Sequence, residues 1–443
     1  MSTNYTSLTS SSSSGLDVTA TVEQLLYVER APERMMQKQQ ALIDSQKSAL
    51  QDLQSKLNSL EDVVAQLRDF SGPLNTRSAT SSDTSVFSAS ADQTAIAGTH
   101  TITVERLATV SSVYTDPVAT DAVITGDLVL TIGTAAPVTI SFNASHATVA
   151  SAAEYINSLQ LDVTAQVITD TTGIRMALVS DTSGAAGALV VESAPPGLGF
   201  NTGDRGEDAK ILVDGIPVFS ATNRVSGVVA GVTLDLISAE PARQLKLSVA
   251  ADTGRAKQAI RNLVASYNSI IKAVNGQFAY DVNTKSAGVL AGDASVRGLQ
   301  SSLLSAMSFQ SDPQSEIRTL KSLGIDMQDD GTLKVNDAAL DGAFAHGADA
   351  VVAFFQGDAA DGFANAFGQE LTRLTDSVDG PLNVDMMGLD NTRKSLSDSI
   401  DDLEARLQMR EQILTAQYTR INTLLQQFTL SQQQLAAMFG NNK

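Results

Sequence analysis

The strongest constraint on the fold is a heptad-like spacing of apolar residues at both ends of the sequence. Near the N-terminus, Leu53, Leu57, Leu60, Val64 and Leu67 follow a strict 4-3-4-3 spacing, which is typical of a coiled-coil seam. Near the C-terminus, the apolar residues that fall mainly on such spacings are Leu389, Leu396, Ile400, Leu403, Leu407, Leu414, Ile421, Leu424 and Phe428. Long helices are therefore predicted at both ends.

Two interpretations of this pattern stay open. The two seams could form a long helical hairpin inside one fold, or a terminal coiled coil that assembles with other chains. We favour the second, because both ends carry the pattern and both are nearly charge-balanced, with net charges of −3 over residues 1–75 and 0 over residues 386–443. Arg393, Arg410 and Gln417 occupy seam positions, where polar residues lower stability but fix register.

Prolines and glycines set the expected helix ends. Pro32 disfavours the helical conformation for the residue before it, which predicts a short helix ending near Arg30 and a long helix that has Pro32 at its start. Residues 70–73, Phe-Ser-Gly-Pro, predict the end of that long helix. The Ser/Thr-rich residues 1–14 are expected to be disordered when the protein is free.

Composition excludes several classes of function. Acidic residues outnumber basic ones 49 to 30, and residues 76–385 hold −16 of the net charge of −19, so a nucleic-acid partner is not expected. No cysteine occurs, which removes disulfides, thiolate nucleophiles and Cys-ligated metals. The sequence contains no run of about 18 apolar residues, so no membrane-spanning helix is predicted. The N-terminus has neither a basic nor an apolar region that would indicate a secretory signal.

Between the two ends, the pattern predicts an α+β multidomain protein. Besides the terminal helical coiled coil, we expect a helical bundle-like domain and two β-rich head domains, one inserted in the other. Residues 211–218 predict a hairpin with Asp214-Gly215 at its turn. The expected boundaries are 1–75 for the N-terminal leg helices, 76–117 and 206–250 for the β-rich head domain, 118–205 for the inserted α+β domain, 251–385 for the helical domain and 386–443 for the C-terminal leg helix.

Two short strings resemble ligand loops only in part. Residues 326–337 match an EF-hand loop at three positions, but Lys334 stands at position 9 and Asp337 replaces the bidentate glutamate, so a β-turn at Asp330-Gly331 is the better interpretation. Residues 197–203 are glycine-rich without the spacing of a dinucleotide loop. No nucleophile, base and acid come together in a known catalytic pattern, and we predict no enzyme activity, cofactor or metal.

Three stretches resemble the flagellar hook-associated protein 2 family, whose members cap flagellar filaments. The first runs from Gly15-Leu16-Asp17 to Glu29-Arg30-Ala31-Pro32. The second contains Val213-Asp214-Gly215, Asn223, Tyr267-Asn268 and Leu290-Ala291-Gly292-Asp293. The third is residues 399–418. In addition, Leu130-Thr131-Ile132 and Tyr155-Ile156-Asn157-Ser158 are similar to a small Ile-Asn repeat of flagellins and hook-associated proteins.

The resemblance implies a non-enzymatic cap protein that forms a homo-oligomeric ring at the filament tip. It would promote insertion and polymerisation of flagellin and prevent its leakage. The implied partners are flagellin, hook-filament junction proteins and an export chaperone, with neither nucleic acid nor membrane insertion. The implied location is extracellular, after export without a cleavable signal peptide. The residues expected to mediate oligomerisation and partner binding are Leu16, Leu25, Leu26, Leu53, Leu57, Leu60, Leu67, Leu396, Ile400, Leu403, Leu407, Leu414, Ile421, Leu424 and Phe428.

Two other classes compete with this interpretation. An extracellular coiled-coil fibre or adhesin would also use terminal coiled coils, but should carry a secretion signal or an anchor. A periplasmic adaptor of export pumps would place its coiled coil in the middle of the chain between β-domains, which is the reverse of the order here.

Overall fold

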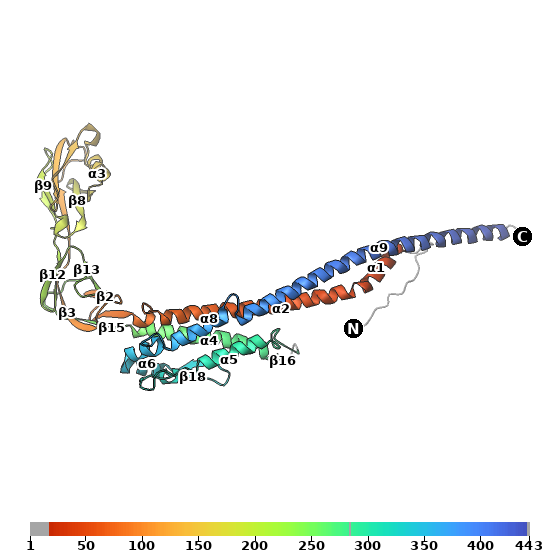
Figure 1. The fold of residues 1–443 in the computed structure, drawn as a ribbon. Helices are drawn as coiled ribbons and strands as arrows, with labels where there is room; N and C mark the ends of the chain where they lie inside the picture. Colours follow the sequence, from red (N-terminus) through yellow and green to blue (C-terminus); the bar gives the residue numbers. More distant parts are fainter. Residues whose placement is uncertain (1–16, 283–284, 441–443) are drawn as a thin grey trace. The chain divides into compact units, whose positions relative to one another are not determined.

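The computed structural model describes residues 17–282 and 285–440 and has a mixed architecture of helices and small sheets (Figure 1). The described residues fall into two compact units, one within Met1–Arg68, Arg261–Ala343 and Ala353–Lys443, the other within Asp69–Ile260 and Phe344–Val352. The α+β multidomain class predicted from the sequence is confirmed. The expectation of disorder for residues 1–14 lies outside the described residues.

The helical elements of the described chain have the following bounds. The α-helices are α1 Val18–Glu29, α2 Ala31–Arg68, α3 Val149–Ser158, α4 Thr253–Phe278, α5 Ala294–Ala306, α6 Asp337–His346, α7 Ala348–Gln356, α8 Phe363–Thr375 and α9 Pro381–Gly440. The 3-10 helices are η1 Pro73–Asn75, η2 Ala144–His146, η3 Ala185–Gly187 and η4 Leu320–Leu323. At 1.5 Å per residue, the 60 residues of α9 extend about 90 Å.

Local chemistry explains the break between the first two helices. Asp17 caps α1 by accepting a hydrogen bond from the Ala20 N–H at 3.0 Å. Helix α1 then ends one residue before Arg30 and α2 begins one residue after it, as Pro32 predicts, because the proline ring cannot donate to the preceding turn. The predicted short helix followed by a long helix is therefore confirmed.

In the first unit, the leucine seam of α2 is covered by the chain's own helices. Leu53, Leu57, Leu60 and Leu67 are at most 1% exposed, and α2 packs against α8 and α9, as the side-by-side course of α2 and α9 shows (Figure 1). The Gln356 side chain donates to the Leu67 carbonyl oxygen at 3.1 Å, and Glu61 accepts from Thr372 and Thr375. The α2 seam thus fills the core of a helical hairpin within one chain.

The second unit contains two sheets that share one core. The five-stranded sheet has the order β1-β15-β3-β11-β12, and the three-stranded sheet has the order β13-β14-β2. Their bounds are β1 Arg77–Ser81, β2 Phe87–Ala91, β3 Gly98–Arg106, β11 Ala209–Val213, β12 Ile216–Ser220, β13 Arg224–Ser226, β14 Val232–Leu236 and β15 Leu245–Ala251. Inward side chains such as Ile102, Leu234 and Leu247 are at most 1% exposed. Alternation along the strands places them there.

The hairpin predicted around Asp214-Gly215 is confirmed. Val213 pairs with Ile216, and both turn residues have positive φ, 51° and 83°, as a two-residue type I′ turn requires. Pro217 follows in β12, a strand at the edge of the sheet. Its missing N–H lies on the outer side of the strand, where it interrupts the row of free donors that would otherwise invite another strand.

The inserted domain consists of two more sheets and α3. The four-stranded sheet has the order β10-β4-β8-β7 and the three-stranded sheet the order β6-β5-β9. The bounds are β4 Val110–Thr115, β5 Gly126–Ile132, β6 Val138–Phe142, β7 Val163–Asp170, β8 Gly173–Ser183, β9 Leu189–Ser193 and β10 Phe200–Thr202. Because β4 pairs with β8 and β10, hydrogen bonding places the start of the insert near residue 110, ahead of the expected boundary at 118.

Three asparagines within the family-like stretches join separate segments of the chain through their side chains. Asn157 accepts from the Ala165 N–H and donates to its carbonyl oxygen, at 2.7 and 2.8 Å. Asn223 bonds Ala108 in the same way, and Asn268 bonds Leu333. Each side-chain amide bonds both the N–H and the C=O of one residue, as the backbone of a neighbouring strand would. This needs both a donor and an acceptor on one side chain.

Asx-type turns give the fold a dependence on acid pH. Asp83, Asp92, Asp170 and Asp330 each accept from the hydroxyl and the backbone N–H of a Ser or Thr two residues on. These hydrogen bonds, the hydroxyl one above all, hold the pKa of each carboxyl below its usual value. A carboxyl with a lowered folded-state pKa stabilises the fold above its unfolded pKa, near 3.9.

We therefore expect the melting temperature to stay level between about pH 5 and 7 and to fall as the pH drops below about 4. The substitutions Asp83→Asn and Asp92→Asn keep the acceptor oxygen but remove the titration, so the combined variant should lose less of its melting temperature in acid than the wild type. The exposed Asp121→Asn serves as the control. Equal acid sensitivity of the wild type and the double variant in thermal unfolding would contradict this account.

The α2 seam generates a second prediction. Leu57→Ala removes a fully buried side chain and should lower the free energy of unfolding by about 2–5 kcal/mol. Leu42→Ala, on the same helix but 49% exposed, should cost less than about 1 kcal/mol. Urea unfolding followed by circular dichroism measures both, and similar costs for the two variants would show that the seam is not the core of the hairpin.

Candidate assembly interface

The first and last helices of the described chain, α1 and α9, pack against each other. Val22, Leu26, Leu407 and Leu414 form a buried cluster, each at most 5% exposed, with the half-buried Val18, Leu403 and Tyr418 around it. The buried apolar residues of α1 therefore pack against residues of the same chain. Burying each of these leucines stabilises the pairing by about 1.5–3 kcal/mol.

Ion pairs along the edge of the hairpin set its register. Glu29 pairs with Arg410 at 3.3 Å, Asp44 with Arg393 at 2.6 Å and Lys47 with Asp390 at 2.6 Å. From one pair to the next, the residue number increases along α1 and α2 while it decreases along α9, so the pairing is antiparallel. Arg393 and Arg410 are two of the polar seam positions identified in the sequence, and each has an acidic partner. Exposed pairs of this kind add little stability but oppose a shifted register.

Beyond Tyr418, α9 continues with exposed apolar side chains. Ile421, Leu424 and Phe428 are 45%, 60% and 64% exposed. At 100° per residue they share one face of the helix. No charged residue occurs between Ile421 and Asn442 in the sequence. An exposed stripe of this kind is typical of a surface that binds another helix.

The predicted interface residues divide by where the structure places them. The buried ones, covered by the same chain, are Leu26, Leu53, Leu57, Leu60, Leu67, Ile400, Leu407 and Leu414, whereas Leu396 and Leu403 are half-buried. The exposed ones are Leu25, Ile421, Leu424 and Phe428. Leu16 lies outside the described residues. A role in binding other chains stays a prediction for the whole set.

Several further exposed apolar residues lie on the same helices, outside the predicted set. Tyr27 and Val28 on α1 are 66% and 68% exposed, and Met35 on α2 is 72% exposed. Leu425, Leu430 and Leu435 extend the exposed apolar surface of α9. A heptad pattern describes only one face of a helix, so it does not identify these residues. The absence of charged residues after Arg420 is the sequence signal that points to the residues of α9.

The ligand-like strings contain ordinary turns. Residues 328–331 turn between β18 Ile325–Met327 and β19 Leu333–Val335, and Asp330 uses its carboxylate to cap Thr332, so the predicted β-turn is confirmed. The only other two-stranded sheet of the described chain pairs β16 Tyr280–Asp281 with β17 Ser286–Ala287. Among the described residues, no three His, Asp or Glu side chains are placed to hold a metal ion.

No single helix of the described chain has the length and apolar composition to cross a membrane. The consecutive helices α6 and α7 meet that criterion only as a bent pair, by length and composition alone.

These observations define a class of protein in which the two ends of one chain pair as a helical hairpin and nested sheets lie between them in sequence. Family models identify the class more closely. The model described as "Flagellar hook-associated protein 2 N-terminus" matches residues 14–111, and the one described as "Flagellar hook-associated protein 2 C-terminus" matches residues 206–429. The chain belongs to the flagellar hook-associated protein 2 family, as its resemblance indicated.

Individual relatives agree. The B-type flagellar hook-associated protein 2 of Pseudomonas aeruginosa is 28% identical over 421 residues, covering 88% of each chain. Flagellar hook-associated protein 2 of Escherichia coli K12 is 26% identical, covering 97% of each chain. Among solved structures, the D1-D2-D3 domains of the flagellar cap protein FliD from Escherichia coli match with a TM-score of 0.59 and 25% identity, over 77% of this chain and 99% of that one.

The α1–α9 cluster generates a prediction about local stability. Leu414→Ala removes a side chain that is 5% exposed and packed in the cluster, so α1 should open more often, with its protection free energy lowered by about 1–3 kcal/mol. Hydrogen–deuterium exchange of α1 peptides measures this change. Leu424→Ala, which lies beyond the cluster, is the control and should leave α1 unchanged. Equal protection in all three proteins would contradict the pairing.

Proposed function

We propose that this chain is a flagellar cap subunit that oligomerises as a ring at the filament tip. There it promotes the insertion and polymerisation of flagellin and prevents its leakage. It acts without enzyme chemistry, outside the cell, after export without a cleavable signal peptide. Flagellin, hook-filament junction proteins and an export chaperone are its partners. Support comes from membership of the family and from the likeness to a solved structure described as a flagellar cap protein.

One structural observation carries the proposal, namely the exposed, uncharged stripe of α9. Helical neighbours in a polymer bury such a stripe, and Ile421, Leu424 and Phe428 together would supply about 5–9 kcal/mol before the entropy of association is subtracted. The buried members of the predicted set, such as Leu57 and Leu407, have a different part. They hold the hairpin together, so that α9 presents the exposed members to other chains.

The rival interpretation, an extracellular fibre or adhesin, lacks comparable support. The relatives described above are named for the flagellar hook or cap, and none of those names refers to adhesion. The experiment below separates the two functions, because an adhesin would not control where flagellin accumulates.

Deletion of the gene should leave short or absent filaments and abundant monomeric flagellin in the medium. Complementation with the wild type should restore filaments. The triple variant Ile421→Gln, Leu424→Gln and Phe428→Gln should fail to restore them, because it removes the apolar stripe while keeping the helix. Quantifying flagellin in cells, on filaments and in the medium distinguishes these outcomes.

The control variant Gln426→Ala with Gln433→Ala changes the opposite face of the same helix segment and should complement fully. Normal filaments in the deletion strain would overturn the proposed function. Full complementation by the triple variant would overturn the role of the stripe alone. Secretion of each variant is checked by immunoblot of the medium, so that a protein that fails in export is recognised.

A further inference from the structure

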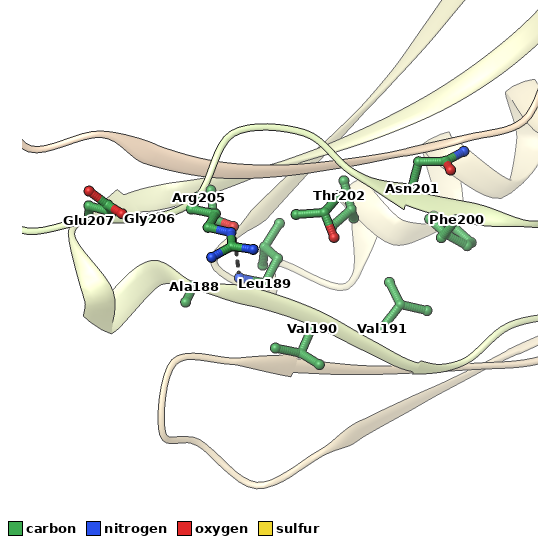
Figure 2. Close-up of a pocket in the computed structure, with 12 residues that line it drawn as sticks. Ala188, Leu189, Val190, Val191, Phe200, Asn201, Thr202, Arg205, Gly206 and Glu207 are labelled. Carbon is green, nitrogen blue, oxygen red and sulfur yellow. Dashed lines mark hydrogen bonds between the residues drawn. The ribbon is translucent and has the colours of Figure 1, made fainter.

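The inserted domain contains an open groove between two strands that belong to different sheets. Strands β9 and β10 form its walls, each at the edge of its own sheet, and the groove has a volume of about 430 Å³. Figure 2 shows the strands running in opposite directions on either side, with Arg205 across from Ala188 at one end and Phe200 across from Val191 at the other. Most of its lining residues lie between 112 and 205, outside both family-model matches.

Backbone groups of β10 point into this groove without a partner. The Asp116 N–H donates to the Gly199 carbonyl oxygen, and the Gly203 N–H donates to the Ser112 carbonyl oxygen. In an antiparallel pair successive residues point to opposite sides, so the residues between them, Phe200 and Thr202, direct their N–H and C=O groups away from β4. No hydrogen bond of the described chain uses these four groups.

The opposite wall has the same property. The Gly133 N–H donates to the Ala188 carbonyl oxygen, so Leu189 and Val191 point away from β5 by the same alternation. The Leu189 N–H reaches the Ser111 hydroxyl at 2.9 Å, which closes one end of the groove. By the same alternation, the Leu189 carbonyl oxygen and the backbone groups of Val191 face away from β5, next to the point where the β5–β9 register shifts. Each wall therefore offers main-chain donors and acceptors.

We propose that this groove binds an extended, otherwise unstructured polypeptide segment as an additional strand between β9 and β10. Such a segment would pair with both walls and join the three-stranded and four-stranded sheets. Each wall offers three residues, so the paired part spans three or four residues, roughly 10–13 Å. The edge strand of a folded sheet does not suit the site, because one of its sides is already paired. The occupant therefore has both edges free.

The chemistry of the groove specifies the segment further. Val191 and Phe200 present half-buried apolar side chains, which favour alternate apolar residues in the segment. Arg205 projects over the groove (Figure 2) and forms no ion pair among the described residues. The other cation of the insert, Arg175, is paired with Asp170. In a region of strongly negative net charge, an unpaired arginine at a groove selects a carboxylate in the partner.

The floor of the groove is held by close packing and hydrogen bonds. A Cβ at Gly206, which lines it, would lie 2.6 Å from the Gly184 carbonyl oxygen, so the backbone there is closely packed. Thr109 fixes the same segment, because its hydroxyl donates to the Arg205 carbonyl oxygen at 2.6 Å and accepts from the Glu207 N–H at 3.2 Å. A preformed site loses little conformational entropy on binding.

The test uses the full chain and a fluorescent ten-residue peptide of alternating valine and threonine with one central glutamate. Fluorescence anisotropy should show saturable binding. The same peptide with N-methylated backbone amides on one edge should bind at least about tenfold more weakly. Methylation removes hydrogen bonds to one wall, and each lost hydrogen bond weakens the affinity several-fold. Arg205→Ala should weaken the glutamate peptide by about tenfold and leave its glutamine counterpart nearly unchanged.

The matched control for Arg205→Ala is Arg224→Ala, an exposed arginine on β13 outside the groove, which should bind both peptides as the wild type does. Thr202→Pro removes one free donor of β10 and should weaken the unmethylated peptide. Circular dichroism confirms that each variant is folded. Binding that ignores backbone methylation overturns the proposal, as does the absence of saturable binding. A change in oligomer size for Thr202→Pro without a change in peptide binding would identify a second copy as the occupant and overturn it as well.

Discussion

The structure depends on antiparallel pairing between the two ends of one chain. Lys47 contacts Asp390 and Glu29 contacts Arg410, across 343 and 381 positions in the sequence. Closing so long a loop costs about 5 kcal/mol in chain entropy, which the buried leucines of α2 and the α1–α9 cluster offset. The nested order of the strands reduces this cost, since β1 with β15 and β3 with β11 each close a part of the intervening chain.

Much of this fold could be predicted from local sequence, because its signals are local. Pro32 placed the break between α1 and α2, and Asp214-Gly215 placed a hairpin turn that no other dipeptide in the segment would favour. The partner of the leucine seam could not be predicted in this way. A 4-3 spacing indicates that one face of the helix is buried but does not identify its partner. Leu57 would have the same spacing in a hairpin within one chain and in a coiled coil between chains.

The resemblance to the family located residues whose physical role appears only in three dimensions. Asn157, Asn223 and Asn268 lie in stretches that are similar to the family. Each amide bonds both backbone groups of another residue, 8, 115 and 65 positions away. The groove between β9 and β10 had no sequence signal, because its chemistry belongs to main-chain groups whose direction depends on register. The expected boundary at 118 left β4 outside the inserted domain for the same reason. Which domain a strand belongs to depends on the strands it pairs with, and composition does not show this.

The division of charge explains how one chain can contain both a water-facing body and a helix suited to burial. Residues 76–385 hold nearly all the net negative charge, which keeps sheet edges apart by repulsion and complements the edge protection at Pro217. After Arg420 the pattern reverses, and α9 combines exposed leucines with glutamines and no charge. Burying a glutamine amide that finds a partner costs far less than burying an ion. This segment of α9 can therefore be buried against other helices and released again without desolvating a charge.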